Sequence, residues 1–160
     1  MPVPSAFPPP RRSPEEILRA AGVAFAMHEH EPVRIHAEAV ERLPFPAGAL
    51  VKTLAAETGG ELVLAALRGG DVLHIGKLAR QLVVARATLN AVTPAAIEHD
   101  LGFEPGAVSL LCDHPGARLV DVAVAGLGTV YVASGRTGRT LELAAADLIA
   151  ATGATVVELV

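Results

Sequence analysis

A lysine interrupts the apolar, strand-like run Leu50-Val51-Lys52-Thr53-Leu54. Burying an ammonium group without a partner costs several kcal/mol. The Lys52 side chain therefore either reaches water on the exposed face of a half-buried strand, or holds an anionic or carbonyl group in a cleft. The first alternative is the usual one for lysine, which is almost never fully buried. The second would give a site its fixed positive charge.

A glycine-proline loop, Gly102-Phe103-Glu104-Pro105-Gly106-Ala107-Val108-Ser109, is the second candidate feature. Its backbone could bracket a ligand, although Pro-Gly is also an ordinary turn dipeptide. Ser134 and Gly135 follow an apolar run, where the serine could offer a hydroxyl group and the glycine could simply permit a tight turn. His30 precedes Glu31-Pro32 and is as consistent with a hydrogen-bonded structural role as with a catalytic one.

Several other chemistries lack their usual residue patterns. His28 and His30 would point the same way on a strand, but no third ligand is apparent, so the sequence predicts no metal site. Cys112 is the single cysteine, which excludes an intramolecular disulfide and a multi-cysteine zinc site. Ser109 and Ser134 lack a recognisable nucleophile motif. Catalysis by positioning and electrostatics remains, with no cofactor.

Composition sets limits on the class of protein. The chain has 160 residues, 51% hydrophobic, which is enough for one domain with a substantial core. Its net charge of −4 is not typical of a nucleic-acid-binding protein, but a few local cations would suffice to grip the end of an RNA. The beginning of the chain does not resemble a signal peptide, and no run is long enough to span a bilayer. We therefore expect a soluble, cytoplasmic protein. The cations available for such a contact with RNA are Arg68, Lys77, Arg80, Arg86, Arg136 and Arg139, although the usual interpretation of each one alone is a solvated surface charge.

The hydrophobic patterns and turn residues predict an α+β fold of short helices and strands. Residues 1–12 are predicted to form a flexible, proline-rich tail and residues 13–160 a single domain. Ser13-Pro14-Glu15-Glu16 is typical of a helix start. Helices are expected at 13–21, 36–43, 76–82, 93–102 and 144–152, and strands at 23–29, 50–57, 61–67, 72–75, 120–124, 129–134, 140–143 and 155–159.

The order of these motifs resembles the YbaK/EbsC family of aminoacyl-tRNA editing domains, which includes the prolyl-tRNA synthetase insertion domain and free-standing ProX-like deacylases. The resemblance runs from about residue 13 to about residue 157. It implies a mixed, mostly antiparallel sheet with a barrel-like core and short flanking helices. The motifs that carry it are HEP at 30–32, VKTL at 51–54, the Gly-Gly hairpin, GFEPGAVS at 102–109 and YVASGRTGRTLELAAADL at 131–148.

The resemblance also implies roles for individual residues. Lys52 matches the family's functional lysine, which holds the acceptor-end adenosine or the ester carbonyl. Leu110 stands where the family usually has proline, so the pocket could be reshaped. We expect the matched residues to line one pocket. Those assigned to substrate binding are His30, Gly106, Ala107, Val108, Ser109, Ser134 and Gly135.

The function expected from the resemblance is hydrolysis of a mischarged aminoacyl-tRNA by a free-standing enzyme. By family analogy the tRNA would be that for proline, carrying alanine, cysteine, serine or threonine. The expected partner is the acceptor end of the tRNA, a cognate synthetase is left open as a second one, and neither a membrane nor DNA is expected. Two alternatives remain: a noncatalytic module that binds tRNA or a synthetase, and a hydrolase for small amino-acid esters.

Overall fold

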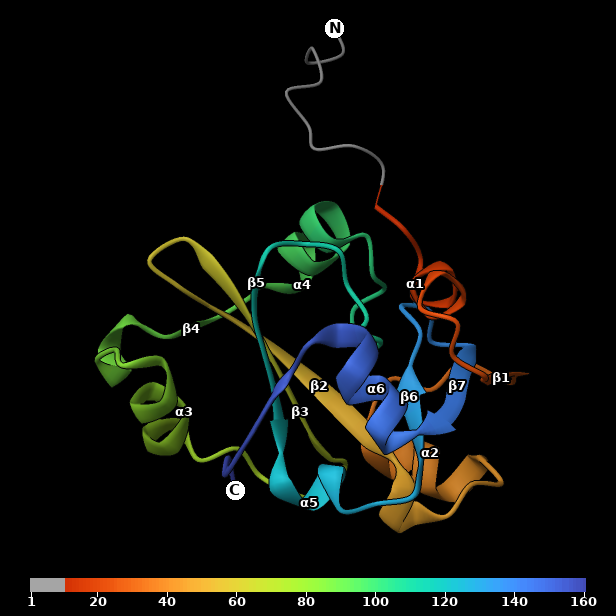
Figure 1. The fold of residues 1–160 in the computed structure, drawn as a ribbon. Helices are drawn as coiled ribbons and strands as arrows, with labels where there is room; N and C mark the ends of the chain where they lie inside the picture. The colour runs from red at the N-terminus through yellow and green to blue at the C-terminus, as the bar shows by residue number, and fades with distance from the viewer. Residues whose placement is uncertain (1–10) are drawn as a thin grey trace, which may run out of the picture.

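The computed structural model describes residues 11–160, whose strands form two sheets. In Figure 1 the hairpin of β2 and β3 crosses the centre of the molecule. The larger sheet has the strand order β4-β2-β3-β5-β8, and the smaller sheet has the order β1-β7-β6. The bounds are β1 Ala26–Glu29, β2 Val51–Thr58, β3 Glu61–Arg68, β4 Asn90–Ala91, β5 Gly116–Asp121, β6 Thr129–Ala133, β7 Arg139–Ala144 and β8 Thr155–Val157.

The pairing is mixed and mostly antiparallel, as predicted. β3 pairs in parallel with β5, and β5 with β8, whereas the other strand pairs are antiparallel. The β2–β3 turn is tight because Gly59 and Gly60 both adopt positive φ, at 58° and 81°. A parallel bridge between Leu50 and Tyr131 joins the two sheets at the start of β2. This junction places Lys52 close to the smaller sheet.

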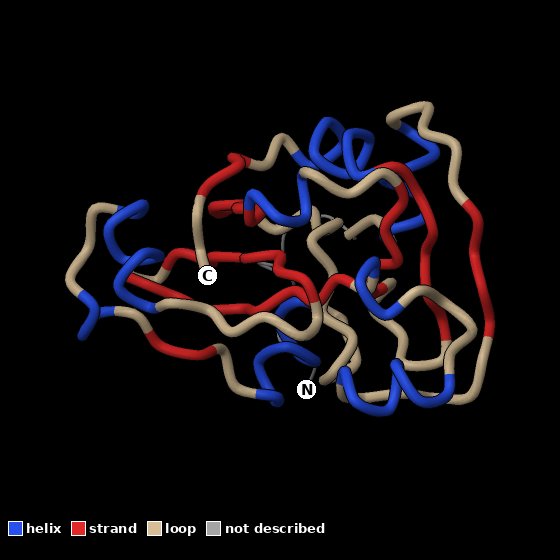
Figure 2. The backbone as a smooth tube through the Cα atoms, turned by 90° about the horizontal axis from the view of Figure 1, so that it is seen from below, coloured by secondary structure: helices blue, strands red, loops and turns tan. Residues whose placement is uncertain are grey.

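Short helices surround the strands on several sides (Figure 2). The first begins as the sequence predicted, because the Ser13 hydroxyl accepts a hydrogen bond from the Glu16 backbone N–H at 3.2 Å. The predicted helix after Thr93 begins as an α-helical turn and continues as a π-helix. The bounds are α1 Pro14–Ala20, α2 His36–Arg42, α3 Ile75–Leu82, α4 Pro94–Ala96 continued by the π-helix Ile97–Leu101, α5 Val122–Ala125 and α6 Ala145–Thr152, with 3-10 turns at Ala47–Ala49 and Arg86–Thr88.

The strand predicted over 120–124 is only partly correct, because β5 ends at Asp121 and the chain turns into α5. The Asp121 carboxylate accepts a hydrogen bond from the Ala123 backbone N–H at 2.9 Å and caps this helix. Its other oxygen accepts from the Leu159 N–H at 2.8 Å. The buried capping carboxylate therefore favours a helix here, although the valines that follow it favour a strand.

The strand predicted over 72–75 is wrong, since this segment is an irregular connection into α3. Val72 is 76% exposed, so it does not pack on a sheet face. His74 instead begins the helix, with its Nδ1 accepting a hydrogen bond from the Lys77 backbone N–H at 3.1 Å. The segment makes an isolated backbone hydrogen bond, from the His74 N–H to the Leu159 carbonyl oxygen at 2.7 Å, which does not build a strand ladder.

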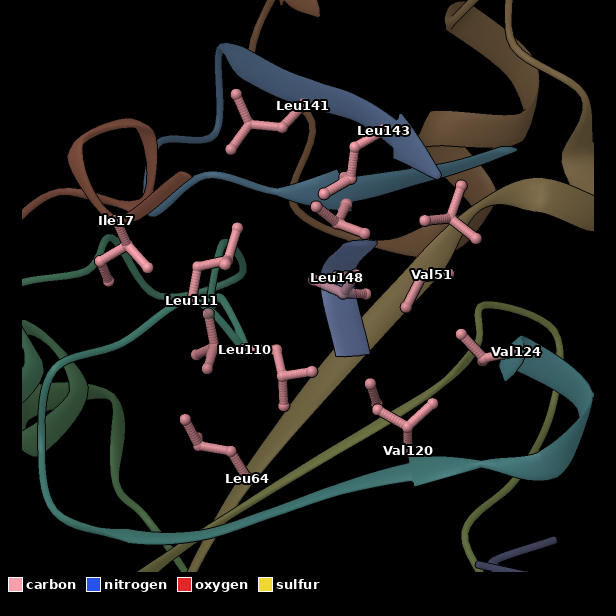
Figure 3. Packing of buried hydrophobic residues seen from close by; sticks show 14 of the residues in the cluster. Ile17, Val51, Leu64, Leu110, Leu111, Val120, Val124, Leu141, Leu143 and Leu148 are labelled. Carbon is pink, nitrogen blue, oxygen red and sulfur yellow. The ribbon is translucent and has the colours of Figure 1, made fainter. Parts of the chain in front are cut away.

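The main core lies between the two sheets. Figure 3 shows side chains of both sheets directed into the same interior, including Leu64 and Val120 from the larger sheet and Leu141 from the smaller one. Leu148 of α6 is fully buried among them. Residues 1–10 of the predicted tail lie outside the described residues, whereas Arg12 forms an ion pair with Asp113 at 2.9 Å.

Candidate active site

A cavity of about 650 Å³ opens along β2, and most of its lining is apolar. One wall is the first part of β2, including Lys52. Facing segments are residues 33–36, the loop 106–108 and the end of β6, and α3 contributes Ile75 and Leu78. A concave, mostly apolar site with a few polar groups is typical of small-molecule binding sites, and this volume is within their usual range.

Lys52 lines the cavity, and its ammonium group is held by the turn that follows β3. Its Nζ donates a hydrogen bond to the Asp71 carbonyl oxygen at 2.6 Å, and the side chain is half-buried. The Asp71 carboxylate is paired with Arg68, Oδ2 to Nε, at 2.9 Å. An ammonium has three donors, so this contact leaves capacity for a substrate oxygen. Lys52 is therefore a positioned positive charge.

The loop 106–108 is held against the segment before α2. Gly106 has a φ of +91°, and a Cβ there would lie 2.9 Å from the Arg34 carbonyl oxygen, so only glycine fits without strain. Ala107 and Val108 are buried. The Ala107 N–H donates to the Glu104 carbonyl at 2.9 Å, which closes the turn. These contacts explain why the loop has one definite shape beside the cavity.

Glu104 connects this loop to the turn after β6. Its carboxylate accepts a hydrogen bond from the Thr137 hydroxyl at 2.8 Å, and its backbone N–H donates to the Gly135 carbonyl at 2.9 Å. The Thr137 hydroxyl, together with the nearby charges of Arg136 and Arg34, holds the pKa of Glu104 below its ordinary value. The carboxylate is therefore ionised at neutral pH and offsets part of the arginine charge at the cavity.

Ser109, Ser134 and Gly135 do not line this cavity, contrary to the sequence-based hypothesis. Ser109 is 1% exposed and its hydroxyl accepts from the Leu111 N–H at 3.1 Å. Ser134 is 3% exposed and its hydroxyl donates to the Arg139 carbonyl at 2.7 Å. Ser134 and Gly135 line a second cavity instead. Both serine hydroxyls stabilise local turns.

His30 does not line the cavity itself but contacts a residue that does. Its two ring nitrogens are 2.7 Å from the Glu31 carbonyl oxygen and 2.7 Å from the Thr140 hydroxyl, and Thr140 lines the cavity. The geometry supports a structural histidine that orients Thr140. Leu110, at the position of the family's proline, is 2% exposed and packs in the main core (Figure 3).

Several polar residues line the cavity although no sequence pattern assigned them to a site, namely Arg34, His36, Tyr131 and Thr140. Tyr131 stacks on Phe45, with ring centroids 4.5 Å apart. The His36 ring packs directly on Gly69, where a Cβ would lie 2.1 Å from its Nδ1. Tyr131 begins the motif at 131–148 that carries the family resemblance, and a polar hydroxyl within an apolar strand is a further signal that could have singled it out.

Gly135→Ala should destabilise the fold. The φ of +89° is costly for alanine, and its Cβ would lie 2.7 Å from Phe103 Cδ1. Backbone strain and overpacking together predict a loss of about 2–4 kcal/mol. Gly153→Ala is the matched control, since φ is +65° but no atom lies within 4 Å. Urea unfolding should show clearly the larger loss for Gly135→Ala, and equal losses would contradict the close packing on Phe103.

A family model, described as an aminoacyl-tRNA editing domain, matches residues 30–151. The chain therefore belongs to the aminoacyl-tRNA editing domain family. No curated protein matches it significantly.

Solved structures agree with this assignment. One described as a "putative trans-editing enzyme for prolyl tRNA synthetase" is 25% identical, with a TM-score of 0.79, covering 89% of this chain and 91% of that chain. A hypothetical protein is 24% identical, with a TM-score of 0.81, covering 91% of this chain and 97% of that chain, which supports the fold. A scaffold protein used in epitope backbone grafting is 26% identical, with a TM-score of 0.79, covering 91% of this chain and 93% of that chain.

Two structural features are absent from residues 11–160. No helix in this range is both long and apolar enough to cross a bilayer. No group of three or more histidine, cysteine, aspartate or glutamate side chains is arranged there to hold a metal ion.

Proposed function

We propose that this protein is a free-standing deacylase that hydrolyses the ester bond of mischarged aminoacyl-tRNA. The observation that carries the proposal is that Lys52 lines an apolar cavity together with the loop 106–108, and that its ammonium group is fixed by the Asp71 carbonyl at 2.6 Å. An aminoacyl ester is already activated, so its hydrolysis needs a placed water, a fixed cation or amide donors, and a selective pocket.

In this proposal Lys52 binds either the terminal adenosine or the ester carbonyl oxygen. Water adds to the carbonyl carbon, and negative charge develops on the carbonyl oxygen, where a preorganised ammonium stabilises it. The bond to the ribose oxygen then breaks, and that oxygen takes a proton. The products are a free amino acid and an intact tRNA. No covalent intermediate with the protein is required.

Substrate selection is assigned to the apolar part of the cavity. Ala107 and Val108 are buried and line it, so a small side chain would be enclosed by aliphatic surface. Such a pocket separates substrates that differ by one methylene by about 1–3 kcal/mol. We propose alanine, cysteine, serine or threonine on the tRNA for proline, by analogy with the family and with the trans-editing structure that this chain resembles.

A panel of mischarged tRNAs would test the function. The purified protein should release the amino acid from at least one tRNA carrying a small non-cognate residue, and should leave correctly charged tRNA intact. Free amino-acid esters should react more slowly than the charged tRNA. Binding of tRNA without hydrolysis would favour the noncatalytic alternative, and equal hydrolysis of free esters would favour a general esterase.

A further inference from the structure

A second cavity, of about 490 Å³, lies beside the first one. It is formed where the start of α1 packs against residues 101–103 and the turn after β6. Figure 1 shows α1 next to the β6–β7 end of the smaller sheet. Arg136 and Arg139 line both cavities, so the two sites share a wall.

The lining of this second cavity is rich in arginine. It contains five arginines and two glutamates, namely Arg11, Arg12, Arg19, Arg136, Arg139, Glu15 and Glu16. Arg12 is paired with Asp113, and Arg139 with Glu29 and Glu15. Arg11 and Arg19 form no ion pair within residues 11–160. The residues before them, 1–10, contain no acidic side chain. Two guanidinium groups are therefore available for an anion.

Glu15 provides an independent sign of a missing ligand. Its side chain is 8% exposed, and Oε1 accepts no hydrogen bond from any residue in 11–160. Arg139 NH1 lies 3.8 Å from that oxygen, which is too far for a hydrogen bond. A buried carboxylate oxygen without a donor is costly, so a ligand with an N–H or O–H group would be favoured here.

We infer that this second cavity binds a ribonucleotide of the RNA segment that leads into the first cavity. A ribonucleotide combines the two features that the lining requires: a phosphate for Arg11 and Arg19, and a ribose hydroxyl or base amine for Glu15. The inference rests on the proposed function. If the aminoacyl ester is held near Lys52, the nucleotides that precede it in the acceptor end must lie on a surface next to the first cavity. Inorganic phosphate alone would contact the arginines but carries no ribose hydroxyl or base amine for Glu15.

The test is binding of an uncharged RNA hairpin with a single-stranded 3′ CCA end, measured by fluorescence anisotropy across a range of salt concentrations. Arg11→Ala/Arg19→Ala should weaken binding and reduce the slope of log affinity against log salt by about one for each phosphate that the protein no longer neutralises. Arg42→Ala is the control, because Arg42 is an exposed arginine that lies outside both cavities and is not among the cations considered for RNA, and the losses of affinity are compared per charge removed. Thermal unfolding should confirm that the double variant and the control are folded.

A second RNA, lacking the single-stranded end, completes the experiment. The effect of Arg11→Ala/Arg19→Ala should largely disappear with this shortened hairpin. Parental affinity in the variant, an equal loss with both hairpins, or an equal loss in the control would each overturn the inference. Binding of uncharged RNA requires no hydrolysis, so this result is independent of whether the protein is a deacylase.

Discussion

Replacement of Lys52 by alanine should reduce single-turnover hydrolysis of a mischarged tRNA by about a hundredfold or more. This is the scale of effect when a preorganised electrostatic donor is removed from a reaction centre. The fold should persist, because the half-buried side chain makes one hydrogen bond, to the Asp71 carbonyl at 2.6 Å. Lys52→Arg should rescue activity only in part, since a planar guanidinium does not replace a compact ammonium.

Lys77→Ala is the matched control for this prediction. Lys77 is the other lysine of the chain, and its Nζ also donates to a backbone oxygen, that of Val160, at 2.6 Å. It does not line the candidate active site. With the protein in saturating excess, its removal should leave the rate at the parental level, because Lys77 was considered only for RNA binding and not for the chemical step. A folded Lys52→Ala protein with the parental rate would show that Lys52 is an ordinary strand residue, and circular dichroism would establish that it is folded.

Gly106→Ala should also impair deacylation strongly. The φ of +91° is unfavourable for alanine, and its Cβ would lie 2.9 Å from the Arg34 carbonyl oxygen, so the loop must move away from this segment. A displacement of about 1 Å in a positioned site can cost about a hundredfold in rate. The rate should therefore fall by about tenfold to a hundredfold, with the same single-turnover assay as the measurement.

Gly22→Ala separates the loop position from backbone strain. Gly22 also has a positive φ, of +70°, but no atom lies within 4 Å of a Cβ built there, and it lines neither cavity. This variant should lose some stability and keep most of its activity. If both variants lost activity equally, the close contact between Gly106 and Arg34 would not be what positions the loop.

Local sequence signals predicted much of the fold. The cap at Ser13 and the Gly59-Gly60 hairpin are each carried by residues close together in the chain, and the structure confirms both. The family resemblance rests on the order of short motifs along the chain, and the family model confirms it. Lys52 was found because a charge within an apolar strand is conspicuous, and it does line the cavity.

The sequence-based predictions that failed concern the direction of a side chain and the packing of segments that are far apart in the chain. Ser134 comes directly after β6 ends at Ala133, and beyond a strand end the alternation of side chains no longer predicts which way a residue points. The pattern therefore could not show that its hydroxyl turns inward to the Arg139 carbonyl. The second cavity depends on α1 packing beside residues more than a hundred positions later, as in the contact between Glu15 and Arg139. No local pattern reports such a juxtaposition.

The most direct test of the proposed function is single-turnover hydrolysis of alanyl-tRNA for proline, with the parent protein in excess over the charged tRNA. The proposal predicts release of free alanine much faster than in buffer, with intact tRNA as the other product and with prolyl-tRNA largely spared. If alanyl-tRNA and the corresponding cysteinyl, seryl and threonyl substrates all decayed only at the rate seen in buffer, the deacylase assignment would be contradicted.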